Sequence, residues 1–167
     1  MTNSVDFPST GRLAAVDYGT VRTGIAICDP DWILASPWSV IDARAGLSDA
    51  SAFVELAKTE QIVGWVVGLP IHCDGNESQK SVDCRAFARW LRDETQMPTR
   101  LFDERFTTVA ANQRLRLQSP TRKQKKQRLD AVAAQILLES FIEACRYHGT
   151  IAGTDAGAAP RGDISLD

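Results

Sequence analysis

Hydrophobic and polar positions divide the first part of the chain into three short apolar segments separated by turn residues. We expect strands at residues 12–18, 24–28 and 33–41, of which the third is weakened by Pro37. Turns rich in Gly and Asp separate these segments. Strands joined by such short turns predict an antiparallel meander.

The pattern then changes to alternating helices and strands. Apolar residues recur with a helical period at 47–57 and 82–91, and the continuous apolar run at 62–69 is typical of a buried parallel strand. A short strand is expected at 100–103, followed by a helix capped by Thr107 that runs to about residue 117. The strongest helical pattern lies at 129–144.

This order predicts an α/β fold with one mixed five-stranded sheet, in which an antiparallel meander is followed by parallel strands flanked by helices. Functional sites in such sheets form where the carboxyl ends of parallel strands converge. We expect a flexible leader at 1–10, one domain at 11–148 and a disordered tail at 149–167, where small and polar residues dominate.

Composition supports one globular domain, since 44% of the residues are hydrophobic and 24% are charged. The first ten residues do not resemble an export signal, and the longest apolar run is too short to cross a bilayer. The four cysteines form no CxxC pair, so reduced thiols are expected. These observations favour a cytoplasmic protein without a membrane partner.

Charge is strongly segregated along the chain. Residues 105–129 hold eight cations and no carboxylate, in a chain whose net charge is −2. One interpretation is a solvated basic loop, and the other is a surface that binds a polyanion. On the second interpretation, nucleic acid would be bound by basic residues drawn mainly from this tract: Arg22, Arg105, Arg114, Arg122, Lys123, Lys125, Lys126 and Arg128.

Three acidic residues are candidates for chemistry. Asp17 follows four apolar residues near the end of the first strand, Glu104 follows the strand at 100–103, and Asp130 lies early in the final helix. Each also has a structural interpretation, as a turn cap, a salt-bridge partner or a helix-dipole partner respectively. If they meet, their mutual repulsion favours a divalent cation, and Mg²⁺ or Mn²⁺ suits oxygen ligands.

Other candidates are weaker. His72 and Cys73 have no matching pair elsewhere in the chain, so a soft metal site is not expected there. The roles of Asp74 and Asp103 stay open.

Four segments together resemble a known family. AVDYGTVRTGIAICD, VVGLPIHCDGNES, LFDERFTTVAA and LDAVAAQILLES occur in this order, and the resemblance to the YqgF/RuvX family spans Arg12 to Tyr147. It implies an RNase H-like fold and a divalent-metal nuclease whose acids match Asp17, Glu104 and Asp130. It also implies a cytoplasmic role in maturing the 5′ end of pre-16S rRNA, with resolution of DNA junctions suggested by similarity to RuvC.

The chain departs from the wider pattern in two places. RNase H-like nucleases commonly carry an acid at the end of the fourth strand, where this chain has Gly68, Leu69 and Pro70. RuvC-like enzymes carry two acids one turn apart on the last helix, where this chain has Ala133 and Ala134 after Asp130. Three acids suffice for one metal ion, and the number of ions stays open.

Four functions compete at this stage. They are an endonuclease acting on structured RNA, a resolvase of four-way DNA junctions, a nucleotide-dependent phosphotransferase suggested by Asp17-Tyr18-Gly19-Thr20, and an RNA-binding module without catalysis. A resolvase requires a symmetric dimer. A phosphotransferase of this kind needs two lobes, for which 167 residues are too few. We expect a nucleic-acid partner and either a monomer or a homodimer.

Overall fold

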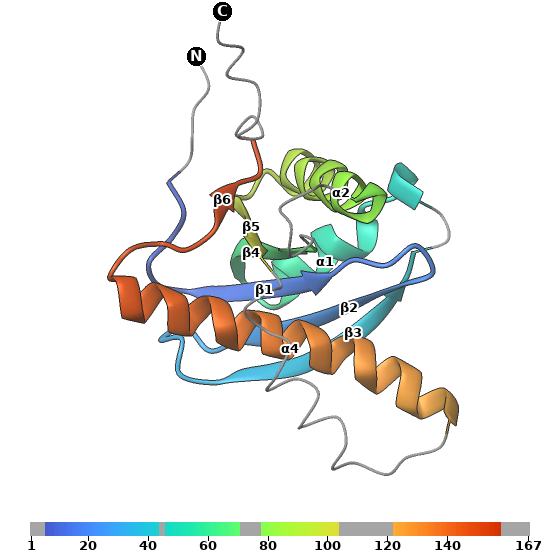
Figure 1. Cartoon of the computed structure of the whole chain (residues 1–167), viewed down its shortest axis with the longest axis horizontal. Coiled ribbons are helices and arrows are strands. Elements are labelled where there is room, and N and C mark those ends of the chain that lie inside the picture. Colours follow the sequence, from blue (N-terminus) through green and yellow to red (C-terminus); the bar gives the residue numbers. More distant parts are fainter. Residues whose placement is uncertain (1–5, 44–45, 71–77, 104–121, 158–167) are drawn as a thin grey trace, which may run out of the picture.

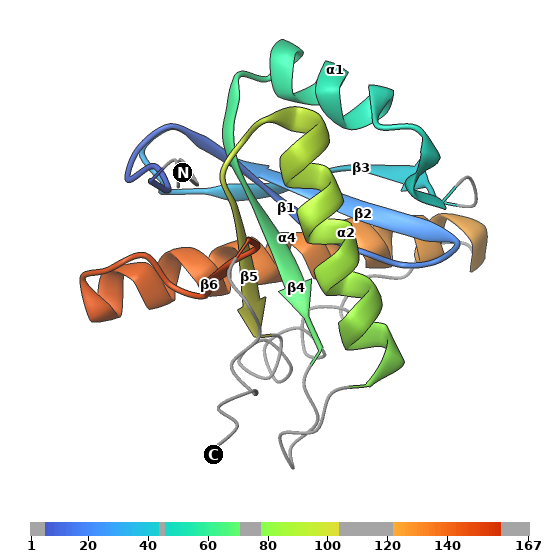
Figure 2. The same cartoon turned by 90° about the horizontal axis from the view of Figure 1, so that it is seen from above.

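The chain folds into one mixed β-sheet that carries helices on both faces (Figures 1 and 2). The computed structural model describes residues 6–43, 46–70, 78–103 and 122–157, without the side chains of residues 122–128. The elements are β1 (Arg12–Asp17), β2 (Arg22–Cys28), β3 (Ala35–Asp42), η1 (Gly46–Ser48), α1 (Ser51–Thr59), β4 (Ile62–Leu69), α2 (Gln79–Thr95), β5 (Thr99–Asp103), α4 (Arg122–His148) and β6 (Thr154–Asp155).

The strands lie in the order β3-β2-β1-β4-β5-β6. β1, β2 and β3 form the antiparallel meander, β4 and β5 run parallel to β1, and β6 is antiparallel to β5. This confirms the predicted α/β class and the mixed sheet. The strand count was wrong, because the sheet has six strands among the described residues instead of five.

Alternation along the strands places two hydrophobic cores on the two faces of the sheet. On β1, Ala14 and Val16 pack with the residues of α1 and α2, whereas Leu13 and Ala15 pack with those of α4. All four side chains are fully buried. Successive strand residues point to opposite faces, so a strand that is apolar at every position must be covered on both sides.

The core that contains Leu13 and Ala15 lies on the face of the sheet covered by helix α4, and it is called the α4-side core. Helix α4 runs across β1, β2 and β3 (Figure 1), and its Phe141 ring lies edge-on to Phe102 of β5 at a centroid distance of 5.7 Å. The helix begins at Arg122, seven residues before the predicted start at residue 129. The basic residues hid this start, because a hydrophobic pattern marks only the part of a helix that packs against the core.

The segments that flank the predicted domain contribute to the fold. Phe7, within the expected flexible leader, packs edge-on against Phe141 at 5.7 Å. Beyond α4 the chain returns to the sheet, where Thr154 and Asp155 pair with β5 and Ala156 is buried. Phe7 and residues 154–156 therefore pack against or pair with the domain, within segments for which the sequence predicted a flexible leader and a disordered tail.

Arg100 explains why the segment after α4 is held in place. Its guanidinium donates hydrogen bonds to the carbonyl oxygens of Ile151, Ala152 and Gly153, and burial lowers its pKa. Gly153 has φ +75° and lies so close to Leu101 that a Cβ would be 2.2 Å from the Leu101 carbonyl oxygen. A chain that reverses direction this tightly requires glycine.

The helix predicted at 107–117 lies outside the described residues. Within the described ranges, the structure contains no helix that combines the length and the apolar character required to cross a membrane.

Candidate active site

The carboxyl ends of three parallel strands meet at one edge of the sheet. Val16 of β1 pairs with Val67 of β4, and Val67 pairs with Leu101 of β5. β1 then ends at Asp17 and β5 at Asp103. Ligands bind at this kind of edge in open α/β sheets, because loops leave the strands there and side chains are freed from packing.

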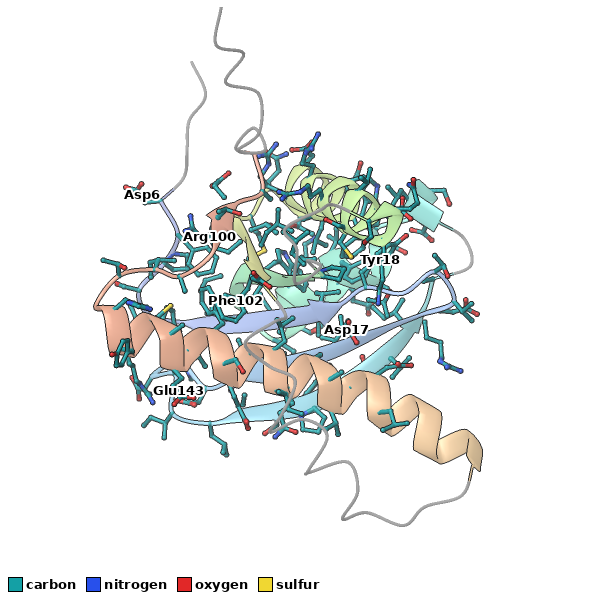
Figure 3. All side chains as sticks on the ribbon, viewed as in Figure 1. Asp6, Asp17, Tyr18, Arg100, Phe102 and Glu143 are labelled. Atoms are coloured by element: carbon teal, nitrogen blue, oxygen red, sulfur yellow. The ribbon has the colours of Figure 1, made fainter. Side chains whose placement is uncertain are left out.

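Asp17 projects from this edge toward α4. Its neighbours at alternate positions, Leu13 and Ala15, belong to the α4-side core, so Asp17 shares their face. Figure 3 shows Asp17 on that side of β1 and Tyr18 on the other side, toward α2. Asp17 is partly exposed, whereas the four residues before it are buried.

Tyr18 belongs to the opposite core. Its ring stacks on that of Phe87 in α2, with centroids 4.3 Å apart and planes inclined by 13°. Burial, followed by the nearby Asp83 carboxylate, raises the pKa of the Tyr18 hydroxyl. Tyr18 therefore anchors the end of β1 to α2, on the face of the sheet opposite to Asp17.

Asp130 reaches the same place from α4 because β2 carries a glycine there. A Cβ built on Gly24 would lie 2.0 Å from the carbonyl oxygen of Asp130, far inside van der Waals contact. Gly24 is also the cross-strand partner of Asp17. Cα atoms of directly opposed antiparallel residues lie about 4.5–5.5 Å apart. One glycine thus brings the backbone of Asp130 next to Asp17, although the two acids are far apart in the sequence.

The carboxylate of Asp130 accepts a hydrogen bond from Arg22, with Nε 2.9 Å from Oδ2. Both side chains are partly exposed, 36% for Arg22 and 29% for Asp130. Asp130 lies more than two turns inside α4, so an interaction with the helix dipole, which is confined to the first turn, does not explain its position.

The remaining candidates are less completely described. Glu104, Arg105 and Arg114 lie outside the described residues. The backbone of α4 carries the basic residues expected to bind nucleic acid at its start, but their side chains are also outside the description: Arg122, Lys123, Lys125, Lys126 and Arg128. His72, Cys73 and Asp74 fall in another undescribed segment.

The donor set fits a divalent cation that prefers oxygen ligands. Asp17 and Asp130 supply carboxylates at a partly exposed edge, and Gly24 provides the close approach that a side chain would prevent. In the described ranges no three His, Cys, Asp or Glu side chains form a metal-binding group. The third acid expected from the sequence is Glu104, the residue directly after β5.

Sequence reasoning did not find two features of this site. One is Gly24, which looks like an ordinary strand residue until the helix is placed on it. The other is the Arg22–Asp130 ion pair, because Arg22 was assigned only to nucleic-acid binding. Asp17, Arg22 and Gly24 follow one another within one predicted hairpin. This arrangement was the signal in the sequence that could have pointed to the site.

Comparisons with known proteins agree with this geometry. The profile of the RuvX family, described as "Holliday junction resolvase", matches residues 11–144. A protein of Rhodopirellula baltica named "Putative pre-16S rRNA nuclease" is 67% identical over 147 residues, which cover 88% of this chain and 85% of that protein. A protein of Corynebacterium jeikeium with the same name is 36% identical over 140 residues, covering 83% and 90% of the two chains.

Among solved structures, RuvC of T. thermophilus in complex with a Holliday junction substrate is similar in fold, with a TM-score of 0.57 at 15% identity. The match covers 86% of this chain and 99% of that chain. A second structure of Thermus thermophilus RuvC gives a TM-score of 0.54 at 13% identity, with 86% and 100% covered.

The sheet order and the helices on both faces define an RNase H-like α/β fold. More specifically, the chain belongs to the RuvX family, also called YqgF.

Proposed function

We propose that this chain is a divalent-metal-dependent endonuclease that processes the 5′ end of pre-16S rRNA, with Asp17, Glu104 and Asp130 as the ligands of Mg²⁺ or Mn²⁺. The observation that carries the proposal is the convergence of Asp17 and Asp130 at Gly24. The names of the two relatives support the RNA substrate. A role on pre-rRNA also implies a cytoplasmic location.

Each acid would have a defined part. Asp17 is fixed by β1 and Asp130 by the packing of α4 on β2, so both carboxylates are preorganised on rigid elements. Glu104 would complete the set from the end of β5. When bound, the divalent ion supplies activation of water and neutralisation of charge on the phosphodiester. Carboxylates held this way cost little reorganisation when the ion arrives.

The basic tract would supply the affinity for nucleic acid. α4 starts inside this tract and continues to Asp130, so the cations at 122–128 precede the acidic site on one continuous helix. Lys and Arg that contact phosphates position a nucleic acid without reading its sequence. The basic tract would therefore bind the backbone of the nucleic acid, while the three acids would lie next to the scissile phosphate.

Resolution of DNA junctions is a second candidate, favoured by the family description and by the RuvC-like fold. It requires two symmetric active sites in a dimer, because paired strands are cut. Cleavage of a pre-16S rRNA fragment and of a synthetic four-way junction should be compared at equal salt. Faster cleavage of the junction, together with a dimer in solution, would favour this second candidate.

The direct test is Asp17→Asn with Mg²⁺ or Mn²⁺. We expect cleavage to fall by at least about a hundredfold, on the scale of lost electrostatic stabilisation, while RNA binding in EDTA is retained. Asp31→Asn is the matched control, since Asp31 is exposed in the turn at the opposite end of β2. Undiminished cleavage by Asp17→Asn would refute the metal-dependent site and leave an RNA-binding module.

A cellular experiment tests the substrate. Cells that carry only Asp17→Asn should accumulate 16S rRNA with an extended 5′ end, measured by mapping the ends of the small-subunit rRNA. Normal 5′ ends combined with a defect in DNA recombination would support the resolvase instead.

A further inference from the structure

The ion pair between Arg22 and Asp130 suggests a role for Arg22 beyond a simple contact with nucleic acid. Arg22 is the first residue of β2 and lies two residues before Gly24, where the backbone of α4 comes very close to this strand. Packing of α4 on β2 therefore brings Arg22 and Asp130 close enough for their side chains to pair. Nε of Arg22 donates to Oδ2 of Asp130 at 2.9 Å.

This single bond leaves part of the guanidinium for another ligand. Arginine has five N–H donors in a planar fork, which matches the oxygens of a phosphate. Among the described residues, the Arg22 side chain makes one hydrogen bond, through Nε. Its side chain is 36% exposed at the strand edge where substrate would arrive.

A divalent ion and Arg22 would compete for the carboxylate of Asp130. Both are cations, so an ion bound by Asp17 and Asp130 would repel the guanidinium and weaken its bond to Oδ2. The existing pair is partly exposed, and such pairs are weak enough to be exchanged at small cost.

We propose that Arg22 is the counter-ion of Asp130 in the metal-free protein, and that ion binding transfers its guanidinium to a substrate phosphate. This inference rests on the proposed metal site. It assigns Arg22 a positioning role that couples metal binding to substrate binding. The same residue then keeps the acids from repelling each other before the ion binds and holds the phosphate afterwards.

The first experiment measures Mn²⁺ binding by calorimetry without nucleic acid. Arg22→Gln should tighten Mn²⁺ binding about two- to fivefold, the range set by the strength of an exposed ion pair. Arg22→Lys retains the charge and should stay close to the unsubstituted protein. Unchanged or weaker Mn²⁺ binding by Arg22→Gln would overturn the proposal, because a residue that merely orients Asp130 would lower the affinity when removed.

Arg12 offers a matched control. It forms an ion pair with Glu60, at 3.3 Å and with similar exposure, but at the opposite end of β1. Arg12→Gln removes the same charge from the protein without touching the acidic edge. It should leave Mn²⁺ affinity unchanged, and an equal gain in Arg12→Gln would show that net charge alone explains the effect, which would also overturn the proposal.

The second experiment needs no metal ion and therefore separates this inference from the proposed function. Binding of a labelled RNA is measured in EDTA for Asp130→Asn, Arg22→Gln and the double variant. Asp130→Asn should release the guanidinium and tighten RNA binding about two- to fivefold, and Arg22→Gln should abolish that gain. A gain of equal size in both backgrounds would overturn the transfer of Arg22 to phosphate.

The two experiments fail in different ways. If neither the unsubstituted protein nor Arg22→Gln binds Mn²⁺, the metal site of the proposed function is wrong, and with it the competition for Asp130. The RNA cycle in EDTA would then still decide whether Asp130 restrains Arg22. If Mn²⁺ binds and only the RNA cycle fails, the metal site stands and the transfer to phosphate is excluded.

Discussion

The carbonyl group of Asp130 lies so close to Gly24 that no other residue type fits at position 24 without moving the helix. This contact sets the depth at which α4 sits on β2. It also determines how near Asp130 comes to Asp17, the partner of Gly24 across the β1–β2 ladder. The packing of α4 and the geometry of the candidate site thus both depend on the contact between Gly24 and Asp130.

Gly24→Ala should therefore damage stability and the site together. We expect the free energy of unfolding to fall by about 1–3 kcal/mol, typical of an overpacked core, as measured by chemical denaturation. Mn²⁺ binding should be lost because α4 is displaced.

Gly64→Ala is the control for this prediction. Gly64 is another sheet glycine, but a Cβ there would meet side-chain atoms of Phe7 at 3.0 Å and of Leu13 at 3.2 Å, which are able to shift. It should retain Mn²⁺ binding. Retention of full Mn²⁺ affinity by Gly24→Ala would show that the acids do not depend on this contact.

Replacing Lys123, Lys125 and Lys126 together with Ala should weaken binding to all nucleic acids alike. The slope of log affinity against log salt should decrease by about 0.7–0.9 for each phosphate that the variant no longer neutralises. Removal of Lys58, Lys80 and Arg89, three cations of α1 and α2, serves as the control for charge. Weaker binding restricted to one sequence, with an unchanged slope, would contradict backbone binding by the tract.

Asp29 provides a pH-dependent contribution to stability at the β2–β3 turn. Backbone N–H groups of Leu34, Asp31 and Ile33 donate to its carboxylate and lower its pKa, with Leu34 contributing most. Because the folded-state pKa lies below the unfolded value of about 3.9, this contribution is complete above that pH. It is lost as the pH falls through the folded value.

Asp29→Asn should therefore reduce the free energy of unfolding most near pH 6 and progressively less toward pH 2.5, as measured by urea denaturation across this range. Asp31→Asn is the control, because its side chain makes none of these bonds. A difference between Asp29→Asn and the unsubstituted protein that does not vary with pH would contradict the role of the charge.

The segment after α4 should stabilise the fold. A chain that ends at His148 lacks β6 and the carbonyl partners of Arg100, whereas a chain that ends at Gly157 keeps both. Comparing the two isolates residues 149–157, and the shorter chain should be less stable by about 2–3 kcal/mol, the sum of a few net hydrogen bonds. Equal urea midpoints for the two chains would show that this segment contributes nothing.

The sequence predicted the sheet well because its strands are marked by dense apolar runs. β1 and β4 are buried on both faces, and such strands leave an unmistakable pattern. β6 escaped prediction because a strand of two residues carries no periodicity. Its position comes from Arg100 and from the tight turn at Gly153, which are tertiary features.

The candidate site was predicted residue by residue but not as a geometry. Asp17 and Asp130 were identified from their positions at element ends, and the structure brings both to one edge of the sheet. Their roles as metal ligands stay predictions, as does that of Glu104, which lies outside the described residues. The sequence pattern did not reveal that Gly24 brings the two acids together. The importance of this glycine depends on α4, which comes much later in the chain.

Because α4 follows β1 in the sequence, the two acids of the site are made at different times during protein synthesis. β1 is made before α4, which packs against β1, β2 and β3. A growing polypeptide in which α4 has not yet been made therefore contains Asp17 without Asp130. The face of the sheet on which α4 packs is then not covered by this helix. The proposed cutting activity would therefore appear only after α4 has been made and has packed on the sheet.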